Sequence, residues 1–290
     1  MKPAPFTYHR ARDVAGAARL LAELGDDAKV VAGGQSLVPM MSFRLARPRH
    51  LVDIGGLREL DYLRAGSDGS LRIGALTTHH TVETAPDTVL GPGFRVLRDA
   101  MGWIGHLPIR TRGTIGGSIA HGDSTAEWCL LAVLLGAEIT ATGPGRQRRI
   151  AARDFFHGFY TTALDPDEIV VEVAFPRPAP HAALTEFAER RGDFAIVAAA
   201  VDLDADAAGT VRGGRVALGG VAPAPVRVPE AEAVLAAGAP PHSHADLFAA
   251  CAARAAEAVN PPADANGSTH YRRTLIRTLV RRACEEAIAR

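Results

Sequence analysis

Two pairs of adjacent glycines constrain this sequence more than any other feature. The first pair, Gly33-Gly34, follows two β-branched residues and precedes Gln35-Ser36 and an apolar run. This order predicts a buried strand that ends in a tight turn, with a short helix starting near Leu37. The second pair, Gly116-Gly117, is also followed by a serine. Because glycine lets backbone N–H groups converge on an anion, the two turns together predict a site for a diphosphate.

Length and composition narrow the class of protein. The chain has 290 residues, enough for two domains of about 150 residues each. Its formal net charge is +0, so no broad attraction to nucleic acid or to an anionic membrane is implied. No apolar run of about 18 residues is present to span a membrane. The first residues lack the apolar core of a signal peptide, so we expect a cytoplasmic protein.

The cysteines and histidines predict no metal site on this chain. Cys129, Cys251 and Cys284 lie far apart and form no CxxC pair, so an iron–sulfur or zinc site is not expected. His79-His80 and His242-Ser243-His244 lack the spacing of a His-Glu-x-x-His helix. Cys129 is interpreted as a core residue of an apolar helix.

Two common phosphate-binding motifs are missing. The only lysines, Lys2 and Lys29, do not follow a glycine-rich loop, which excludes a P-loop. The Rossmann fingerprint fails because Gly143-Pro144-Gly145 has Arg148 where the third glycine belongs. We interpret this segment as a hairpin turn. No Gly-x-Ser-x-Gly elbow is present either, so no catalytic nucleophile is predicted.

Apolar periodicity predicts the order of helices and strands. Helices are expected over residues 14–24, 94–105 and 126–135, and strands over 28–32, 51–54, 71–76, 137–142 and 169–175. Three prolines within residues 176–180 predict a linker. Beyond it, strands are expected over 183–190, 195–204 and 211–221, and helices over 230–237, 245–259 and 271–289. This pattern predicts domains over 1–177, with subdomains of about 1–57 and 58–177, and over 178–290.

The residues around both glycine pairs resemble the flavin motifs of a known family. Ala32 to Met41, followed by Arg47-Pro48 and Leu51 to Ile54, is similar to the first motif of the FAD-binding subunits of molybdenum hydroxylases. These include the medium subunit of aerobic carbon monoxide dehydrogenase and the flavin domain of xanthine dehydrogenase. Arg112 to Asp123 is similar to the second motif, and Arg190 to Ala195 resembles the start of the C-terminal domain. The resemblance covers essentially the whole chain.

The resemblance implies both a fold and a function. The fold is of class α+β: a vanillyl-alcohol-oxidase-like, PCMH-type FAD-binding fold of two α/β subdomains, then a small α+β domain of the carbon monoxide dehydrogenase flavoprotein type. The function is that of an FAD-dependent oxidoreductase subunit, which takes electrons from an iron–sulfur subunit and passes them to an external acceptor. Molybdopterin is expected on a large subunit and iron–sulfur clusters on a small one, assembled as a dimer of heterotrimers.

The resemblance also implies which residues bind FAD, and it implies no catalytic side chain on this chain. The two glycine segments would cradle the pyrophosphate and the ribityl chain. Glu127 matches an acidic residue that reaches sugar or ribityl hydroxyls, and Ile104 and Leu164 match apolar positions beside the cofactor. The expected FAD-binding residues are Val30, Val31, Ala32, Gly33, Gly34, Gln35, Ser36, Leu37, Ile104, Thr114, Ile115, Gly116, Gly117, Ser118, His121, Asp123, Glu127, Leu164 and Arg191.

Several positions depart from the family pattern. Ser118 replaces the commoner Asn or Asp, and Glu127 is one methylene longer than the usual Asp. Arg190 and Arg191 stand in the region where some relatives place a lysine near the flavin. The serine and glutamate departures leave open a non-catalytic subunit whose flavin site has decayed. A free-standing FAD-dependent oxidoreductase of the same fold is a further alternative.

Two further expectations concern single changes and surface charge. Replacing Gly33 or Gly117 with alanine is expected to abolish FAD retention and leave the fold largely intact, because a Cβ at positive φ costs about 1–2 kcal/mol. The pairs Arg272-Arg273 and Arg281-Arg282 on the last predicted helix are interpreted as a solvated face. A subunit contact is the alternative for these arginines.

Overall fold

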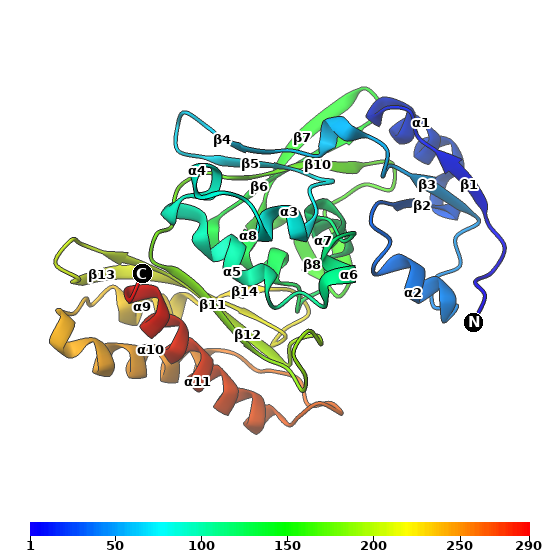
Figure 1. Cartoon of the computed structure of the whole chain (residues 1–290). Helices are drawn as coiled ribbons and strands as arrows, with labels where there is room; N and C mark the ends of the chain where they lie inside the picture. The colour runs from blue at the N-terminus through cyan, green and yellow to red at the C-terminus, as the bar shows by residue number, and fades with distance from the viewer.

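The computed structural model describes residues 1–290, which form three main sheets with helices packed against them (Figure 1). The first unit is a parallel sheet in the order β1-β3-β2. Its elements are β1 (Thr7–Arg10), α1 (Val14–Leu24), β2 (Ala28–Val31), α2 (Leu37–Ser42) and β3 (His50–Asp53). Helix α1 begins where the Asp13 carboxylate accepts a hydrogen bond from the Gly16 N–H at 2.6 Å, and it ends at Gly25, whose φ is +58°.

The second unit is built on a five-stranded sheet in the order β4-β5-β10-β6-β7. All its pairs are antiparallel. Its strands are β4 (Leu63–Ala65), β5 (Leu71–Gly74), β6 (Glu138–Gly143), β7 (Arg146–Ala151) and β10 (Ile169–Phe175), with a separate ribbon of β8 (Phe156–Gly158) and β9 (Thr161–Thr162). Its helices are α3 (His79–Glu83), α4 (Asp87–Leu90), α5 (Arg95–Met101), α6 (Leu107–Arg110), α7 (Ile115–His121) and α8 (Glu127–Leu135). The predicted hairpin turn at Gly143 to Gly145 is confirmed between β6 and β7.

Helix α8 is the centre of the molecule's largest core. Every residue of α8 after Glu127 is buried, which explains why its sequence is apolar on all sides. The helix ends at Gly136 in a left-handed conformation. Cys129 is buried there, as predicted, with its thiol 3.6 Å from the Ser118 carbonyl. The residues that begin α8 are therefore held at a fixed position beside α7.

The C-terminal unit is a four-stranded antiparallel sheet with helices on one face. The sheet order is β11-β12-β13-β14. Its elements are β11 (Ala182–Phe187), β12 (Val197–Ala205), β13 (Val211–Gly219), β14 (Val226–Arg227), α9 (Pro229–Leu235), α10 (His244–Ala258) and α11 (Thr269–Ile288). Figure 1 shows α10 and α11 on the face that points away from α5 and α8. The other face of the sheet therefore forms the seam with the second unit.

Side chains of β11 alternate between these two faces. Ala182 and Leu184 belong to the core around α8. Ala183 belongs to the core beneath α10 and α11, and the Thr185 hydroxyl donates to the Leu279 carbonyl of α11 at 2.9 Å. Because side chains alternate along a strand, the next residue, Glu186, faces the seam.

One surface expectation is wrong. Arg272 is only 4% exposed, and its guanidinium donates to the carbonyls of Ile196 and Gly220 and to both oxygens of Asp264. Because α11 is polar along much of its length, its sequence pattern does not mark Arg272 as a buried position. The buried charge is paired within the domain. Arg272 therefore ties α11 to the ends of β12 and β13 and does not belong to a solvated face.

Candidate functional site

The first glycine segment leaves a row of backbone donors free. It lies between β2 and α2, with Gly34 at φ +72° as the turn requires. The Gln35 side chain donates to the Gly33 carbonyl at 2.9 Å. No backbone N–H from Ala32 to Leu37 donates a hydrogen bond within the chain. Since unpaired N–H groups in a bend form a concavity that favours an anion, this segment fits a phosphate-bearing ligand.

The second glycine segment is the first turn of a helix, and the expectation of a second open turn is wrong. Thr114 is the N-cap of α7, and its hydroxyl accepts from the Gly117 N–H at 3.1 Å. The N–H groups of Ile115 and Gly116 donate to the carbonyls of Thr77 and Ala75. The N–H of Ser118 bonds the Thr114 carbonyl in turn. In this segment only Thr114 keeps a free backbone N–H, because the α7 N-terminus is docked on the end of β5.

The fold brings the two glycine segments into direct contact. A Cβ built on Gly33 would overlap the carbonyl oxygen of Arg112, immediately before the second segment. A Cβ on Gly113 would lie 2.6 Å from Nε2 of His79. The two segments, about 80 residues apart in the sequence, therefore face one another across backbone atoms alone.

The expected strain at two of the glycines is absent. Neither Gly33 nor Gly117 has a positive φ; in the first segment that conformation belongs to Gly34. Gly33 lacks space for a side chain because Arg112 is close, and Gly116 lacks it because Ala75 is close. Over Gly117 the nearest atom to a built Cβ is the Thr114 hydroxyl oxygen at 2.9 Å, with nothing else within 4 Å. The glycines of the two pairs therefore serve different purposes.

His79 anchors the second segment from below. It is 5% exposed, and its Nδ1 accepts from the Trp128 indole N–H at 2.9 Å. Burial, with a smaller contribution from the charge of Arg110, lowers the pKa of His79 to about 4. A neutral imidazole thus links α3 to α8 directly beneath Gly113. The sequence alone shows only a histidine at the start of a short helix and does not predict its contact with Trp128.

The remaining expected cofactor residues lie around these segments. His121 ends α7 and packs against the Tyr160 ring at 4.8 Å between centroids; burial lowers its pKa, opposed by Asp123. The Asp123 carboxylate accepts from the N–H and hydroxyl of Thr125 at 2.9 and 2.8 Å. Tyr160 itself has a φ of +52°. No sequence motif pointed to Tyr160.

Two further expected residues pack in the second unit, and a third, Arg191, reaches it from the C-terminal unit. Ile104 and Leu164 are partly buried and pack against the core around α8. The Arg191 guanidinium lies 3.9 Å from where a Cβ on Gly102 would be. The C-terminal unit therefore reaches back to the end of α5, close in sequence to Ile104.

Glu127 opens α8 beside the seam. Burial first, and then the charge of Asp123, raise the pKa of the Glu127 carboxyl. On the opposite side, Glu186 is 7% exposed, and its Oε2 is buried without a hydrogen-bond partner. Sequence reasoning did not single out Glu186, because one glutamate at an alternating strand position reads as an ordinary surface residue.

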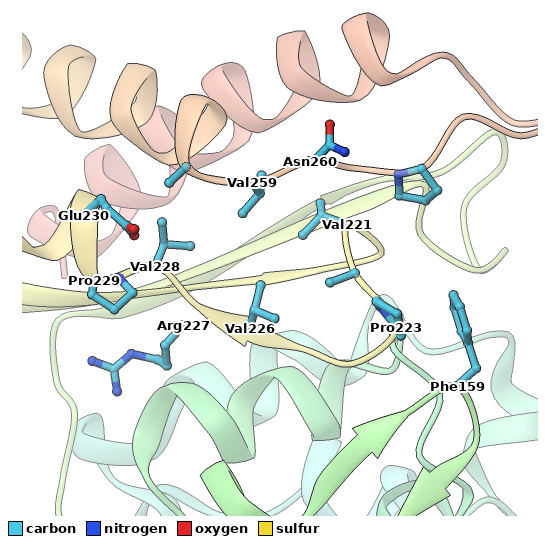
Figure 2. A pocket seen from close by; sticks show the side chains of 13 residues that line it. Phe159, Val221, Pro223, Val226, Arg227, Val228, Pro229, Glu230, Val259 and Asn260 are labelled. Carbon is cyan, nitrogen blue, oxygen red and sulfur yellow. The ribbon is translucent and has the colours of Figure 1, made fainter.

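A separate cavity lies between the C-terminal unit and Phe159, which connects β8 and β9. It has a volume of about 520 Å³, and its lining includes Phe159, Val221, Pro223, Val226 and Asn260 (Figure 2). None of its lining residues belongs to the expected FAD site. No group of three or more His, Cys, Asp or Glu side chains is placed to hold a metal ion. None of the helices combines the length and apolar character needed to cross a bilayer.

Two families of known domains match the chain. The FAD binding domain in molybdopterin dehydrogenase matches residues 4–178, and the CO dehydrogenase flavoprotein C-terminal domain matches residues 182–287. The chain belongs to the FAD-binding subunits of the molybdenum hydroxylases. This membership confirms the expected fold class, FAD as the cofactor and an FAD-dependent oxidoreductase subunit.

Relatives of this family are similar over their full length. The alpha subunit of the 6-hydroxypseudooxynicotine dehydrogenase complex from Paenarthrobacter nicotinovorans is 40% identical, covering 100% of this chain and 97% of the relative. The carbon monoxide dehydrogenase medium chain of Afipia carboxidovorans is 38% identical, covering 100% and 99%. A chain of quinoline 2-oxidoreductase from Pseudomonas putida 86 superposes with a TM-score of 0.92 at 34% identity, covering 100% and 99%. The FAD subunit described here is thus the medium subunit of a molybdenum-hydroxylase-type dehydrogenase.

Proposed function

We propose that this FAD subunit takes electrons from an iron–sulfur subunit and passes them to an external acceptor. The observation that carries the proposal is the free row of N–H groups from Ala32 to Leu37, which lies against the second glycine segment. Several N–H groups can hold a diphosphate without a lysine, since each charge-assisted hydrogen bond contributes about 1.5–3 kcal/mol. FAD supplies the redox chemistry when bound, and this chain supplies binding and orientation.

The proposed FAD site combines both glycine segments with the seam. The N–H groups of the first segment, with Val30 and Val31 behind them, would hold the diphosphate. Thr114 and Ser118 offer hydroxyl groups, and Gly117 offers open space above the α7 N-terminus. Around them we assign to the site Ile104, Ile115, Gly116, His121, Asp123, Glu127, Leu164 and Arg191. We propose domain bounds of 1–177, with subdomains 1–57 and 58–177, and 178–290.

We propose that the partners are a large molybdopterin-binding subunit and a small iron–sulfur subunit, in a dimer of heterotrimers in the cytoplasm. Relatives are named as subunits or medium chains of such dehydrogenases. Apolar side chains next to the glycine segments support a docking surface, because large exposed apolar groups mark interaction sites. The exposed residues of this surface on α2 and α6 and just after α2 are Val38, Phe43, Leu45, Leu107 and Ile109.

Purification from the native host tests this function. We expect the chain to carry FAD, seen in its visible absorbance, and to co-purify with a molybdenum subunit and an iron–sulfur subunit. A chain that carries FAD, turns over a donor alone and purifies without partners would be a free-standing oxidoreductase. A chain without flavin at any step would have a decayed site, and the proposal would be wrong.

A matched pair of variants locates the docking surface. Phe43→Asp places a charge on the exposed apolar surface and is expected to lose the small subunit while FAD stays bound. Tyr271→Asp serves as its control, because Tyr271 is an exposed aromatic residue of α11, and α11 lies on the face of the C-terminal sheet that points away from α5 and α8. Equal loss of partners in both variants would contradict the location proposed here.

A further inference from the structure

Glu186 lies at the seam between the two domains, opposite the start of α8. Along the sheet it pairs with Ala198, and Ala198 pairs with Gly219. A Cβ on Gly219 would lie 3.1 Å from the Ser124 carbonyl in the loop that leads into α8. The N–H of the next residue, Gly220, donates to the same carbonyl at 3.0 Å. This row of three residues therefore presents Glu186 to the α8 N-terminus, where Glu127 lies.

One carboxyl oxygen of Glu186 has no hydrogen-bond partner. Its side chain is more than nine-tenths buried, yet Oε2 has neither a donor nor an acceptor in the protein. A buried carboxyl oxygen without a partner is costly, by the desolvation argument that applies to any buried polar group. The atom is therefore available to a proton or to a ligand group.

The charges that face the two glutamates are all acidic. The negative charge of Asp123 raises the pKa of Glu127, and that of Glu127 raises the pKa of Glu186. The neighbour of Glu186 on β12 is the apolar Ala198. Arg272, the buried arginine near this end of the sheet, is engaged by Asp264 and by two backbone carbonyls. No cation compensates the pair.

We propose that Glu127 and Glu186 share one proton at the domain seam, and that this protonated pair is part of the FAD site, where it receives the hydroxyl-bearing chain of the dinucleotide. The inference rests on the proposed FAD site and adds to it a residue from the C-terminal domain. Glu186 is a positioning residue in this arrangement, since it holds Glu127 and completes the hydrogen bonds around the cofactor. No electron or covalent bond moves in this step; the pair takes up one proton from solvent.

The electrostatics give the direction of the pH dependence. Burial, with the charge of Glu127, raises the pKa of Glu186 above its ordinary value, and burial also raises that of Glu127. The phosphates of bound FAD add negative charge and favour the protonated pair further. FAD therefore binds more tightly when the proton is present, and its affinity falls as the pH rises through the pKa of the pair, by at most about tenfold per pH unit for one proton.

The test is the FAD dissociation constant of the full chain, stripped of flavin and titrated with FAD between pH 6 and pH 9. We expect the wild-type constant to rise by about tenfold or more over this range. Glu186→Gln keeps a side chain of the same shape and removes one of the two titrating carboxyls. Its constant is therefore expected to match the wild type at pH 6 and to rise by a smaller factor than the wild type by pH 9, because only Glu127 then titrates. Glu189→Gln is the matched control, because Glu189 is exposed on the same segment, and it should follow the wild-type curve.

Thermal unfolding of the flavin-free chain gives a second readout. A carboxyl with a raised pKa stabilises the folded chain at low pH and loses that contribution as the pH rises. The wild type should therefore lose stability from pH 6 to pH 9, and Glu186→Gln should lose less. If Glu186→Gln binds FAD with the wild-type pH profile, the shared proton is wrong while the FAD site stands. If the wild type binds FAD at no pH, the proposed function itself fails.

Discussion

The two glycine pairs look alike in the sequence and do opposite things in the structure. From Ala32 to Leu37 the backbone N–H groups have no acceptor in the protein. From Ile115 to Ser118 every backbone N–H has one. The first segment thus offers donors to a ligand, whereas the donors of the second are paired within the protein. The second segment supports the first by packing against it. A glycine pair by itself does not identify an anion site.

The difference arises from the residues before each pair. Thr114 precedes Gly117 by three positions, which is the spacing at which an N-cap hydroxyl accepts from the third helical N–H. The residue at the equivalent position before the first pair is Val31, which has no side-chain oxygen that can cap. The first segment therefore remains an open bend, and its donors stay available.

The largest expected effect comes from Gly33→Ala. The added Cβ overlaps the Arg112 carbonyl, so the two segments must separate. Overpacking of this kind costs about 1–3 kcal/mol of unfolding free energy or more. The displaced turn also loses N–H contacts to the diphosphate, which corresponds to an FAD affinity about 100-fold weaker. Denaturant unfolding and an FAD titration of the same variant measure both losses.

This variant separates two descriptions of the first segment. A loss of FAD affinity without any loss of stability would mean that Gly33 contacts only the ligand. The overlap with Arg112 argues against that result. Wild-type stability and wild-type affinity together would show that the close contact of the segments is not required.

A comparable loss of stability, without a direct loss of FAD contacts, is expected from the acid sensitivity of the second segment. The pKa of His79 is lowered to about 4, so the unfolded chain binds this proton more strongly than the folded one. Stability is complete above the unfolded pKa of about 6.5 and falls as the pH drops toward 4, by about 3 kcal/mol in all. His79→Asn keeps an acceptor for Trp128 and should remove this part of the acid loss. Denaturant unfolding at pH 7.5 and pH 4.5 compares the two proteins; equal acid losses would contradict the prediction.

Much of the fold could be predicted from the sequence, because its signals are local. The period of α1, the stop at Gly25 and the linker prolines are all within a few residues of what they determine. The parts that could not be predicted depend on distant partners. Arg272 reads as a surface residue until Asp264 and two carbonyls surround it. Glu186 reads as an ordinary strand residue until the sheet is placed against α8.

Removal of the helix cap is expected to have an intermediate effect. Thr114→Ala deletes the hydroxyl that accepts from the Gly117 N–H, which costs about 1 kcal/mol of unfolding free energy. Thr111→Ala is the matched control, because the exposed Thr111 hydroxyl donates only to the Pro108 carbonyl nearby; its cost should stay within about 0.5 kcal/mol. Equal costs measured by denaturant unfolding would show that the cap does not stabilise the second segment.

The smallest change in stability is expected for Gly117→Ala. Its φ is not positive, and alanine in a helix is favoured over glycine by up to about 1 kcal/mol, which offsets the contact with the Thr114 hydroxyl. The protein therefore gains little from a glycine here, in contrast to Gly33 and Gly116. The open space above Gly117 is explained if the cofactor occupies it. We expect unfolding free energy within about 0.5 kcal/mol of wild type and FAD affinity at least about tenfold weaker, since a methyl group in that space overpacks the site. Unchanged affinity in an FAD titration would mean that the cofactor lies elsewhere and that the α7 N-terminus only supports the first segment.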